Sequence, residues 1–121
     1  MRRKKPKSKE APVQKAIKQY LELRGCRVLR TNAGKSFIRN PAGEITRAVQ
    51  MAPTGTADLN GCLPWGQFFA LEIKAPGNEP TEAQWDYLRE IAAIGGHAGW
   101  ADSIEAAEKF FDKGKAKWEL R

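Results

Sequence analysis

Residues 68–74 (FFALEIK) predict a β-strand, because their side chains alternate between two faces with a period of two. Phe69, Leu71 and Ile73 fall on one face, and Glu72 falls on the opposite face at the end of the apolar run. A carboxylate in such a strand is costly to bury unless a positive charge compensates it. The segment therefore predicts a strand and, at its end, a position that needs a cationic partner.

Apolar residues spaced three and four positions apart predict two helices around the central strands. The first begins at a cap on Ser8 and ends near Arg24, before Gly25. The second begins at Thr81, because the run TEAQ matches a capping box. Its expected buried side consists of Trp85, Leu88, Ile91 and Ala92.

Short runs of β-branched and aromatic residues, separated by turn residues, predict the other strands. The first is residues 26–31 and the last is residues 97–101. Between them, residues 37–51 predict a hairpin around the turn sequence NPAG, and a further strand begins at Asp58. This last strand is expected to lie beside the strand that carries Glu72.

A third helix, capped by Asp102 or Ser103, is expected to end near Phe111 and to leave residues 113–121 as a loosely held tail. The predicted order is helix, several strands, helix, strand and helix. Such an order is typical of an α/β domain with a mixed sheet flanked by helices. At 121 residues the chain is long enough for one domain with a single core.

The net charge of +7 is concentrated at the N-terminus. Residues 1–9 hold six basic side chains, which leaves the rest of the chain at about +1. We expect this segment to be a disordered arm that binds polyanions through counterion release. The alternative is an arm that only increases solubility.

Membrane and secretory functions are not indicated. No run of about 18 apolar residues occurs, and no apolar stretch follows the basic N-terminus. Cys26 and Cys62 lack metal-ligand spacing and are expected to be reduced and buried in a cytoplasmic protein, with a disulfide as the alternative. His97, the single histidine, is expected to be structural.

Asp58 and Glu72 on adjacent strands, with Lys74 beside them, would form a small cage of oxygen atoms next to a cation. Mg²⁺ and Mn²⁺ prefer oxygen ligands, and Mg²⁺ often takes only one or two protein carboxylates. The ammonium group of Lys74 would then orient a water or stabilise a developing negative charge. The alternative is an exposed ion pair between Glu72 and Lys74 at a strand end.

Five short motifs occur together in this chain. They are Glu10 with Gln14, RTNAG from Arg30, GTAD ending at Asp58, EIK from Glu72, and TEAQ from Thr81. In this order and spacing, residues from about 10 to 111 resemble the VRR-NUC family, a branch of the PD-(D/E)xK nuclease superfamily. The superfamily motif has a proline before the first acid, whereas this chain has Ala57 before Asp58. This position supplies no ligand.

The resemblance implies a restriction-endonuclease-like mixed sheet flanked by helices, with the nuclease domain spanning residues 10–112. It also implies a metal-dependent phosphodiesterase that acts on DNA with Mg²⁺ or Mn²⁺. The matched site residues are the acids Asp58, Glu72 and Glu10, the carbonyl of Ile73, the lysine Lys74 and the glutamine Gln84. Two of these keep alternatives, since Glu10 would also suit the dipole of a helix N-terminus and Gln84 would also complete the capping box.

Chains this short resemble stand-alone phage and bacterial proteins that form homodimers and are similar to Holliday-junction resolvases. We therefore expect a structure-selective endonuclease in the cytoplasm of a bacterium or a phage-infected host. The alternatives are a non-catalytic DNA-binding module and a nonspecific or flap nuclease. Candidate contacts with DNA are Arg30, Lys35, Arg39, Arg47 and Gln14, and candidate dimer-interface residues are Trp65, Trp100 and Trp118, which would otherwise pack in the core.

Overall fold

The computed structural model describes residues 10–31, 35–50 and 52–121. The expected basic arm and the cap on Ser8 lie outside these residues. Across the described ranges the chain forms three helices and six strands. These are α1 (Glu10–Leu23), β1 (Arg27–Arg30), β2 (Lys35–Arg39), β3 (Ile45–Gln50), β4 (Leu59–Cys62), β5 (Phe68–Ile73), α2 (Glu82–Ala93), β6 (His97–Ala101) and α3 (Ile104–Glu119).

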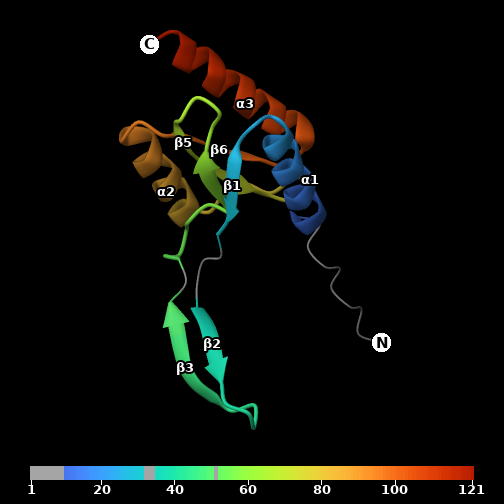
Figure 1. Ribbon diagram of the computed structural model, residues 1–121, viewed down its shortest axis with the longest axis vertical. Helices are drawn as coiled ribbons and strands as arrows, with labels where there is room; N and C mark the ends of the chain where they lie inside the picture. The colour runs from blue at the N-terminus through green and yellow to red at the C-terminus, as the bar shows by residue number, and fades with distance from the viewer. Residues whose placement is uncertain (1–9, 32–34, 51) are drawn as a thin grey trace.

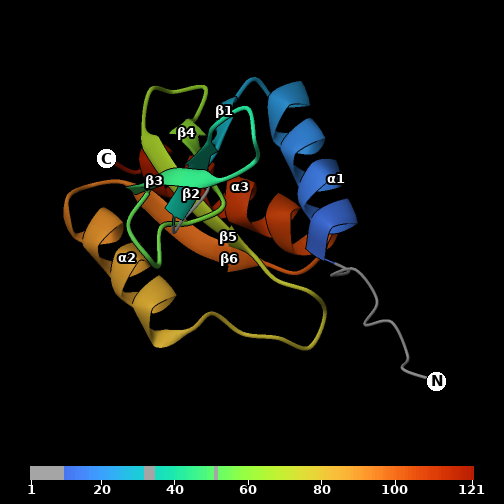
Figure 2. The same ribbon diagram turned by 90° about the horizontal axis from the view of Figure 1, so that it is seen from below.

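The central sheet has the strand order β1-β4-β5-β6. β4 is antiparallel to both β1 and β5, whereas β5 and β6 are parallel. Two parallel strands need a crossover between them, and α2 provides it. Figure 2 shows α2 on one side of the sheet and α1 with α3 on the other. The predicted mixed sheet flanked by helices is confirmed.

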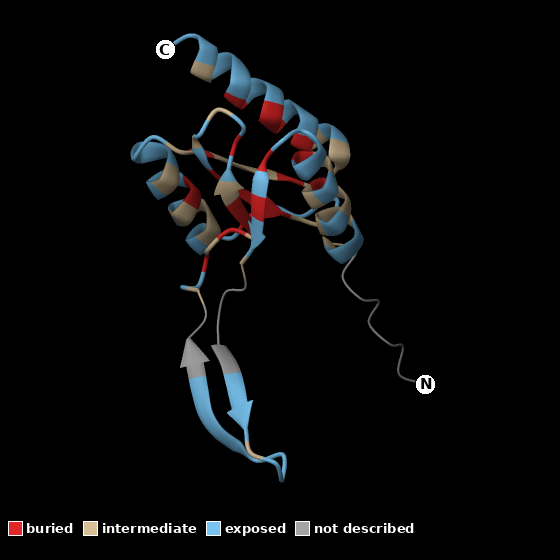
Figure 3. Cartoon of the chain, in the orientation of Figure 1, coloured by how far each residue is buried: buried red, intermediate tan, exposed pale blue. Residues whose placement is uncertain are grey.

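β5 is buried on both faces and organises the core. Its residues Phe69, Leu71 and Ile73 pack with side chains of α1 and α3, whereas Ala70 packs with Leu88 of α2. Buried residues concentrate on the inner strands and on the inward sides of the helices in Figure 3. Glu72 alternates with its neighbours along the strand, so it lies on the side of the sheet that α2 covers.

α3 extends well beyond the end expected near Phe111, so the prediction of a loose tail from Lys113 was wrong. The helix continues because Gly114 is buried against His97 of β6. A Cβ atom at position 114 would lie 2.6 Å from the imidazole Cδ2 atom, so glycine allows the helix and the strand to approach. The N-cap of α3 is Ser103, whose side chain accepts a hydrogen bond from the Ala106 amide.

Two further expectations about burial are corrected. Ala92 is exposed, so the inward side of α2 is made by Leu88 together with the partly buried Trp85 and Ile91. Cys62 at the end of β4 is also exposed, whereas Cys26 is buried and both thiols are free. Burial raises the pKa of the Cys26 thiol to about 11, which leaves it unreactive near neutral pH.

β2 and β3 form a separate two-stranded sheet, as the hairpin pattern predicts. Its turn is closed by Asn40, whose amide donates to the carbonyl of Glu44 and whose side chain accepts from the Glu44 amide. Figure 1 shows the hairpin extending away from the central sheet, on the side toward which the β1 arrow points. Within the described part of the chain, no helix is long and apolar enough to cross a membrane.

Candidate metal centre

The end of β5 and the start of β4 bring two acids together. Leu59 pairs with Leu71, so one further step in this antiparallel register sets Asp58 beside Glu72. The Asp58 carboxylate accepts a hydrogen bond of 3.0 Å from the Ile73 amide. Asp58 is therefore tied to β5 by its side chain at the position where the two strands meet.

Glu10 joins these acids from the first residue of α1. One carboxylate oxygen from each of Glu10, Asp58 and Glu72 lies within 4.8 Å of the others. Three carboxylates so close repel one another unless a cation lies among them. The cluster provides the oxygen ligands that Mg²⁺ and Mn²⁺ prefer, and water would complete the coordination shell.

Glu72 is the most informative of the three acids, because its side chain is only 2% exposed. Burial raises the pKa of Glu72 to about 9. A side-chain hydrogen bond with Asp58 and the charges of Asp58 and Glu10 also raise this pKa, and the charge of Lys74 opposes them. Its Oε2 atom has no hydrogen-bond partner among the described residues. A buried carboxylate oxygen that no protein donor satisfies has the environment expected of a metal ligand.

The pKa of Glu10 is also raised, first by burial and then by the charge of Asp58, with Lys74 acting in the opposite direction. Both perturbed acids therefore respond to the same two neighbours. A bound divalent cation would reverse these shifts, because it would stabilise the ionised form of each carboxyl group.

Gln84 combines the two roles that the sequence left open. Its side-chain Oε1 atom accepts a hydrogen bond from the Thr81 backbone amide at 2.8 Å, and its backbone amide donates to the Thr81 hydroxyl. The capping box is therefore present. Its Nε2 atom donates to Oε1 of Glu72 at 3.1 Å. One side chain therefore starts α2 and fixes the orientation of the Glu72 carboxylate.

Lys74 follows β5 and is held by a backbone hydrogen bond of 2.9 Å from its amide to the carbonyl of Ala101. Its charge lowers the pKa of both Glu10 and Glu72, which sets it next to the acid cluster. The alternative of an exposed Glu72–Lys74 ion pair is wrong, since Glu72 is buried and no such pair occurs among the described residues. The role of the Ile73 carbonyl as a ligand stays a prediction.

Asn60 and Tyr87 were not anticipated as parts of this site. The side-chain amide of the buried Asn60 donates to the Ala57 carbonyl at 2.8 Å and to the Thr31 hydroxyl at 3.1 Å. The hydroxyl of Tyr87, on α2, donates to Asn60 Oδ1 at 2.7 Å. Asn60 thus links the residue before Asp58 to Thr31, which follows β1, and to Tyr87 on α2. The signal in the sequence is a polar residue two positions after Asp58, on the same face of a strand.

The predicted DNA contacts fall into two places. Gln14, one turn after Glu10, and Arg30, at the end of β1, line the same small pocket of about 240 Å³. Arg39 and Arg47 are exposed on the hairpin, and Arg39 donates to the Gly43 carbonyl at 2.9 Å. Lys35 belongs to β2, but its side chain lies outside the described part of the structure.

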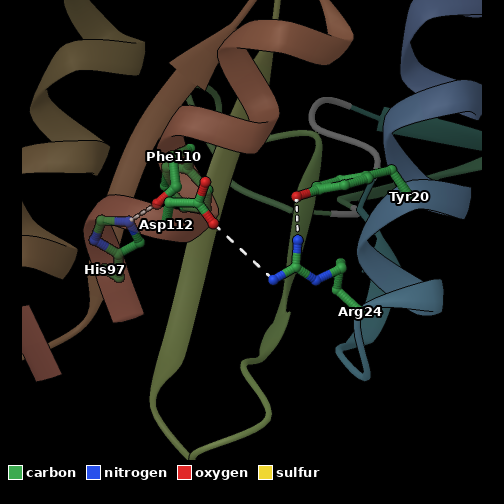
Figure 4. A network of polar contacts seen from close by, with 5 residues as sticks. All are labelled: Tyr20, Arg24, His97, Phe110 and Asp112. Carbon is green, nitrogen blue, oxygen red and sulfur yellow. Dashed lines mark hydrogen bonds and ion pairs between the residues drawn. The ribbon is translucent and has the colours of Figure 1, made fainter. Parts of the chain in front are cut away.

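His97 has a structural environment, as expected. It is buried in β6, its Nε2 atom lies 2.7 Å from the Phe110 carbonyl, and its ring stacks on the Phe110 ring at 4.1 Å (Figure 4). Figure 4 also shows Arg24 between Tyr20 and Asp112, a contact that links α1 to α3. These residues hold the helices on the sheet and take no part in the acid cluster.

The three tryptophans considered for a dimer interface contact their own chain. Trp65 packs edge-on against Phe111 with ring centroids 5.4 Å apart, and Trp100 packs against the core under α2. Trp118 is partly buried, and the guanidinium group of Arg121 lies 4.1 Å from the centre of its ring. The structure thus favours packing within the chain for these side chains.

The mixed sheet, the flanking helices and the acids at the meeting point of β4 and β5 define a restriction-endonuclease-like fold. The structure is similar to a solved structure described as "VRR_NUC domain", with a TM-score of 0.60 and 21% sequence identity. The similarity covers 88% of this chain and 97% of that one. It supports the fold that the sequence motifs predict. No protein-family model matches the sequence, and no curated protein matches it.

Proposed function

We propose that the protein is a Mg²⁺- or Mn²⁺-dependent DNA endonuclease that hydrolyses phosphodiester bonds. The observation that carries the proposal is the Oε2 atom of the buried Glu72, which has no hydrogen-bond partner among the described residues and lies next to Asp58 and Glu10. A structural ion network would pair this oxygen with a lysine, an arginine or an amide. The likeness to a VRR_NUC domain supports the same reading, because that description names a nuclease domain.

Asp58, Glu72 and Glu10, with the Ile73 carbonyl, are the residues that would hold the metal. When bound, such an ion supplies a water of lowered pKa and neutralises charge on the phosphate. Lys74 orients this water or stabilises the negative charge that develops on the phosphate oxygens. Gln84 keeps the Glu72 carboxylate in one orientation through its Nε2 hydrogen bond.

The substrate is DNA, which the protein holds through basic side chains outside the acid cluster. Arg39 and Arg47 on the hairpin, together with Lys35, contact phosphates of a DNA arm, and Gln14 with Arg30 contact phosphates beside α1. A hairpin that extends from the body and carries exposed arginines supports contact with a branched substrate. The enzyme is therefore structure-selective, similar to a Holliday-junction resolvase, and acts in the cytoplasm where such DNA occurs.

Paired cuts in a four-way junction need two active sites, so the protein acts as a homodimer. Exposed apolar side chains of the hairpin, Phe37, Ile38 and Ile45, are better candidates for the interface than the tryptophans. Measuring the mass in solution over a range of concentrations tests this point. A monomer mass at every concentration would contradict the dimer and leave the cleavage proposal intact.

A non-catalytic DNA-binding module is the second candidate, and the exposed arginines suit it equally well. The acid cluster disfavours it, because carboxylates near a phosphate repel it unless a cation lies between them. A nonspecific or flap nuclease would share the same centre, and only the choice of substrate separates it from a resolvase.

The deciding experiment is the cleavage of labelled four-way junction, flap and linear duplex DNA with Mg²⁺, Mn²⁺ or EDTA. We expect metal-dependent cutting that Asp58→Asn and Lys74→Ala each reduce about 10²-fold or more. The matched control is Asp86→Asn on α2, which removes an exposed carboxylate 2.7 Å from Arg89 and should cut normally. DNA binding without cutting in any metal, unchanged in all variants, would favour the binding module.

A further inference from the structure

A groove of about 480 Å³ runs along the free edge of the central sheet, between β6 and α3. β6 is the last strand in the sheet order, so no further strand of the described chain pairs with its outer side. Gly99 of β6 and Gly114 of α3 also line the groove, where they add no side chain and let the helix lie close to the strand. An edge strand with an open groove beside it is accessible to an extended chain.

The groove is strongly basic. Lys109, Lys113 and Lys117 line it from α3 and recur every four residues, which sets them about 6 Å apart along the helix axis. No acidic residue lines the groove, and the ion pairs found among the described residues involve none of these lysines. Like charges four residues apart repel one another on a helix, so the row favours an anionic partner.

Two of these lysines, Lys113 and Lys117, influence the pKa of His97 in β6. Burial lowers the pKa of His97, the backbone contact with Phe110 opposes this, and the charges of Lys117 and Lys113 lower it further. Their ammonium groups are thus close enough to His97 of β6 to influence its titration. This agrees with the place of Lys113 and Lys117 in the groove lining beside β6 (Figure 4 shows His97 and Phe110 at this junction).

One end of the groove adjoins the acid cluster. Trp100, which lines the groove, pairs with Glu72 in the parallel register of β5 and β6. The amide of Lys74 donates to the carbonyl of the next β6 residue, Ala101. A chain lying in the groove would therefore leave it one strand away from Glu72.

We infer that this groove binds the sugar-phosphate backbone of a DNA strand and leads it away from the metal centre. The inference rests on the proposed function for the identity of the anion. A phosphodiester chain carries charge at regular, short intervals, which suits a regular row of lysines. Trp100, a partly buried residue that packs under α2 and lines the groove, offers an aromatic side chain to an unpaired base, so the groove prefers a single strand to a duplex.

The test is the salt dependence of binding to single-stranded and duplex DNA of equal length, without divalent metal so that no cutting occurs. A variant with Lys109→Gln, Lys113→Gln and Lys117→Gln is expected to lose about two units of the logarithmic salt slope for single-stranded DNA. Its affinity at low salt should fall about tenfold or more. Thermal unfolding checks that the variant is folded.

A matched pair of single variants keeps the test valid if the triple variant does not fold. Lys113→Gln removes a charge from the groove lining, whereas Lys115→Gln removes the same charge two residues away on the same helix, outside the groove lining. We expect the first variant to bind single-stranded DNA more weakly and the second to bind as the wild type does. Equal affinities and equal salt slopes for this pair would overturn the inference. A loss confined to duplex DNA would contradict the preference for a single strand.

Cleavage measured in parallel separates this inference from the function proposed above. If the wild type cuts DNA and the triple variant keeps the wild-type salt slope, the proposal that the groove binds DNA is wrong and the proposed nuclease activity is unaffected. If the wild type cuts no DNA and the triple variant has a smaller salt slope, DNA binding in the groove is supported and the proposed nuclease activity is contradicted.

Discussion

Asp58 is held by contacts with three different segments. Its backbone carbonyl accepts from the Thr31 amide at 2.9 Å, its carboxylate accepts from the Ile73 amide, and Asn60 holds the carbonyl of the residue before it. Asn60 is itself oriented by the hydroxyl of Tyr87. The position of a candidate metal-binding acid thus depends on a tyrosine that belongs to α2.

This dependence predicts the effect of Tyr87→Phe. The change leaves the buried Oδ1 atom of Asn60 without its donor, at a cost of about 1–3 kcal/mol in the free energy of unfolding. We expect the cleavage rate to fall about tenfold and the concentration of Mg²⁺ needed for half-maximal cutting to rise, because the loop before Asp58 becomes less ordered.

Tyr20→Phe is the matched control, since it also removes one tyrosine hydroxyl. Within the part of the chain that the structure describes, the hydroxyl of Tyr20 accepts its one hydrogen bond from the exposed Arg24, which follows α1 and lies away from the acids. Cleavage and metal dependence should be unchanged in this variant. An equal loss in both variants, or a lower unfolding temperature in Tyr87→Phe with normal metal dependence, would contradict a positioning role.

The sequence predicted which acids meet, because strand alternation and an ordered set of motifs fix their places. It did not predict that Gln84 would bond both Thr81 and Glu72, since this depends on the distance between α2 and β5. The Asn60–Tyr87 contact joins residues 27 positions apart on different elements, so no local pattern reveals it. Side-chain contacts between elements are the part that sequence reasoning missed.

At the level of whole elements, every predicted strand and helix is present, and the largest error concerns α3. Gly114 inside a lysine-rich segment favours a helix end when the sequence is read alone. In the structure this glycine packs against His97, and the tertiary contact outweighs its low helix propensity. Helix length was therefore decided by packing on β6, which the local sequence does not contain.

Among the described elements, the β2–β3 hairpin forms a sheet of its own, apart from the central sheet. A two-stranded hairpin is only marginally stable alone, and this one keeps Phe37, Ile38 and Ile45 exposed. If Arg39 and Arg47 contact DNA phosphates, then Arg39→Ala with Arg47→Ala should lower the logarithmic salt slope of duplex binding by about two units. Affinity at low salt should fall with it.

The control for this pair is Arg89→Ala with Arg121→Ala, which removes the same charge from exposed positions outside the hairpin. Fluorescence anisotropy across a salt series measures all three proteins without cutting. A hairpin variant with the wild-type salt slope would show that these arginines do not reach the DNA. A slope reduced equally in the control would indicate a general effect of net charge.

For the whole molecule, the buried acid cluster links stability to pH and to metal. Glu72 ionises in the unfolded chain near its ordinary pKa of 4.5, whereas burial raises the pKa in the fold to about 9. Between these values the folded protein holds one more proton than the unfolded chain. Stability in EDTA should therefore fall as pH rises through this window, with a slope of up to about 1.4 kcal/mol per pH unit.

Glu72→Gln removes this titration and keeps an oxygen atom that can accept from Gln84. In EDTA, thermal unfolding between about pH 7 and pH 9, above the range in which a histidine titrates, should show wild type losing stability relative to the variant. Mg²⁺ or Mn²⁺ should raise the unfolding temperature of wild type, because ion binding favours the folded state, and leave that of the variant unchanged. Glu79→Gln, at an exposed position, should behave as wild type does in both respects. Parallel pH profiles for wild type and Glu72→Gln in EDTA would mean that Glu72 is ionised without a metal, and that its burial is compensated by a contact within the protein.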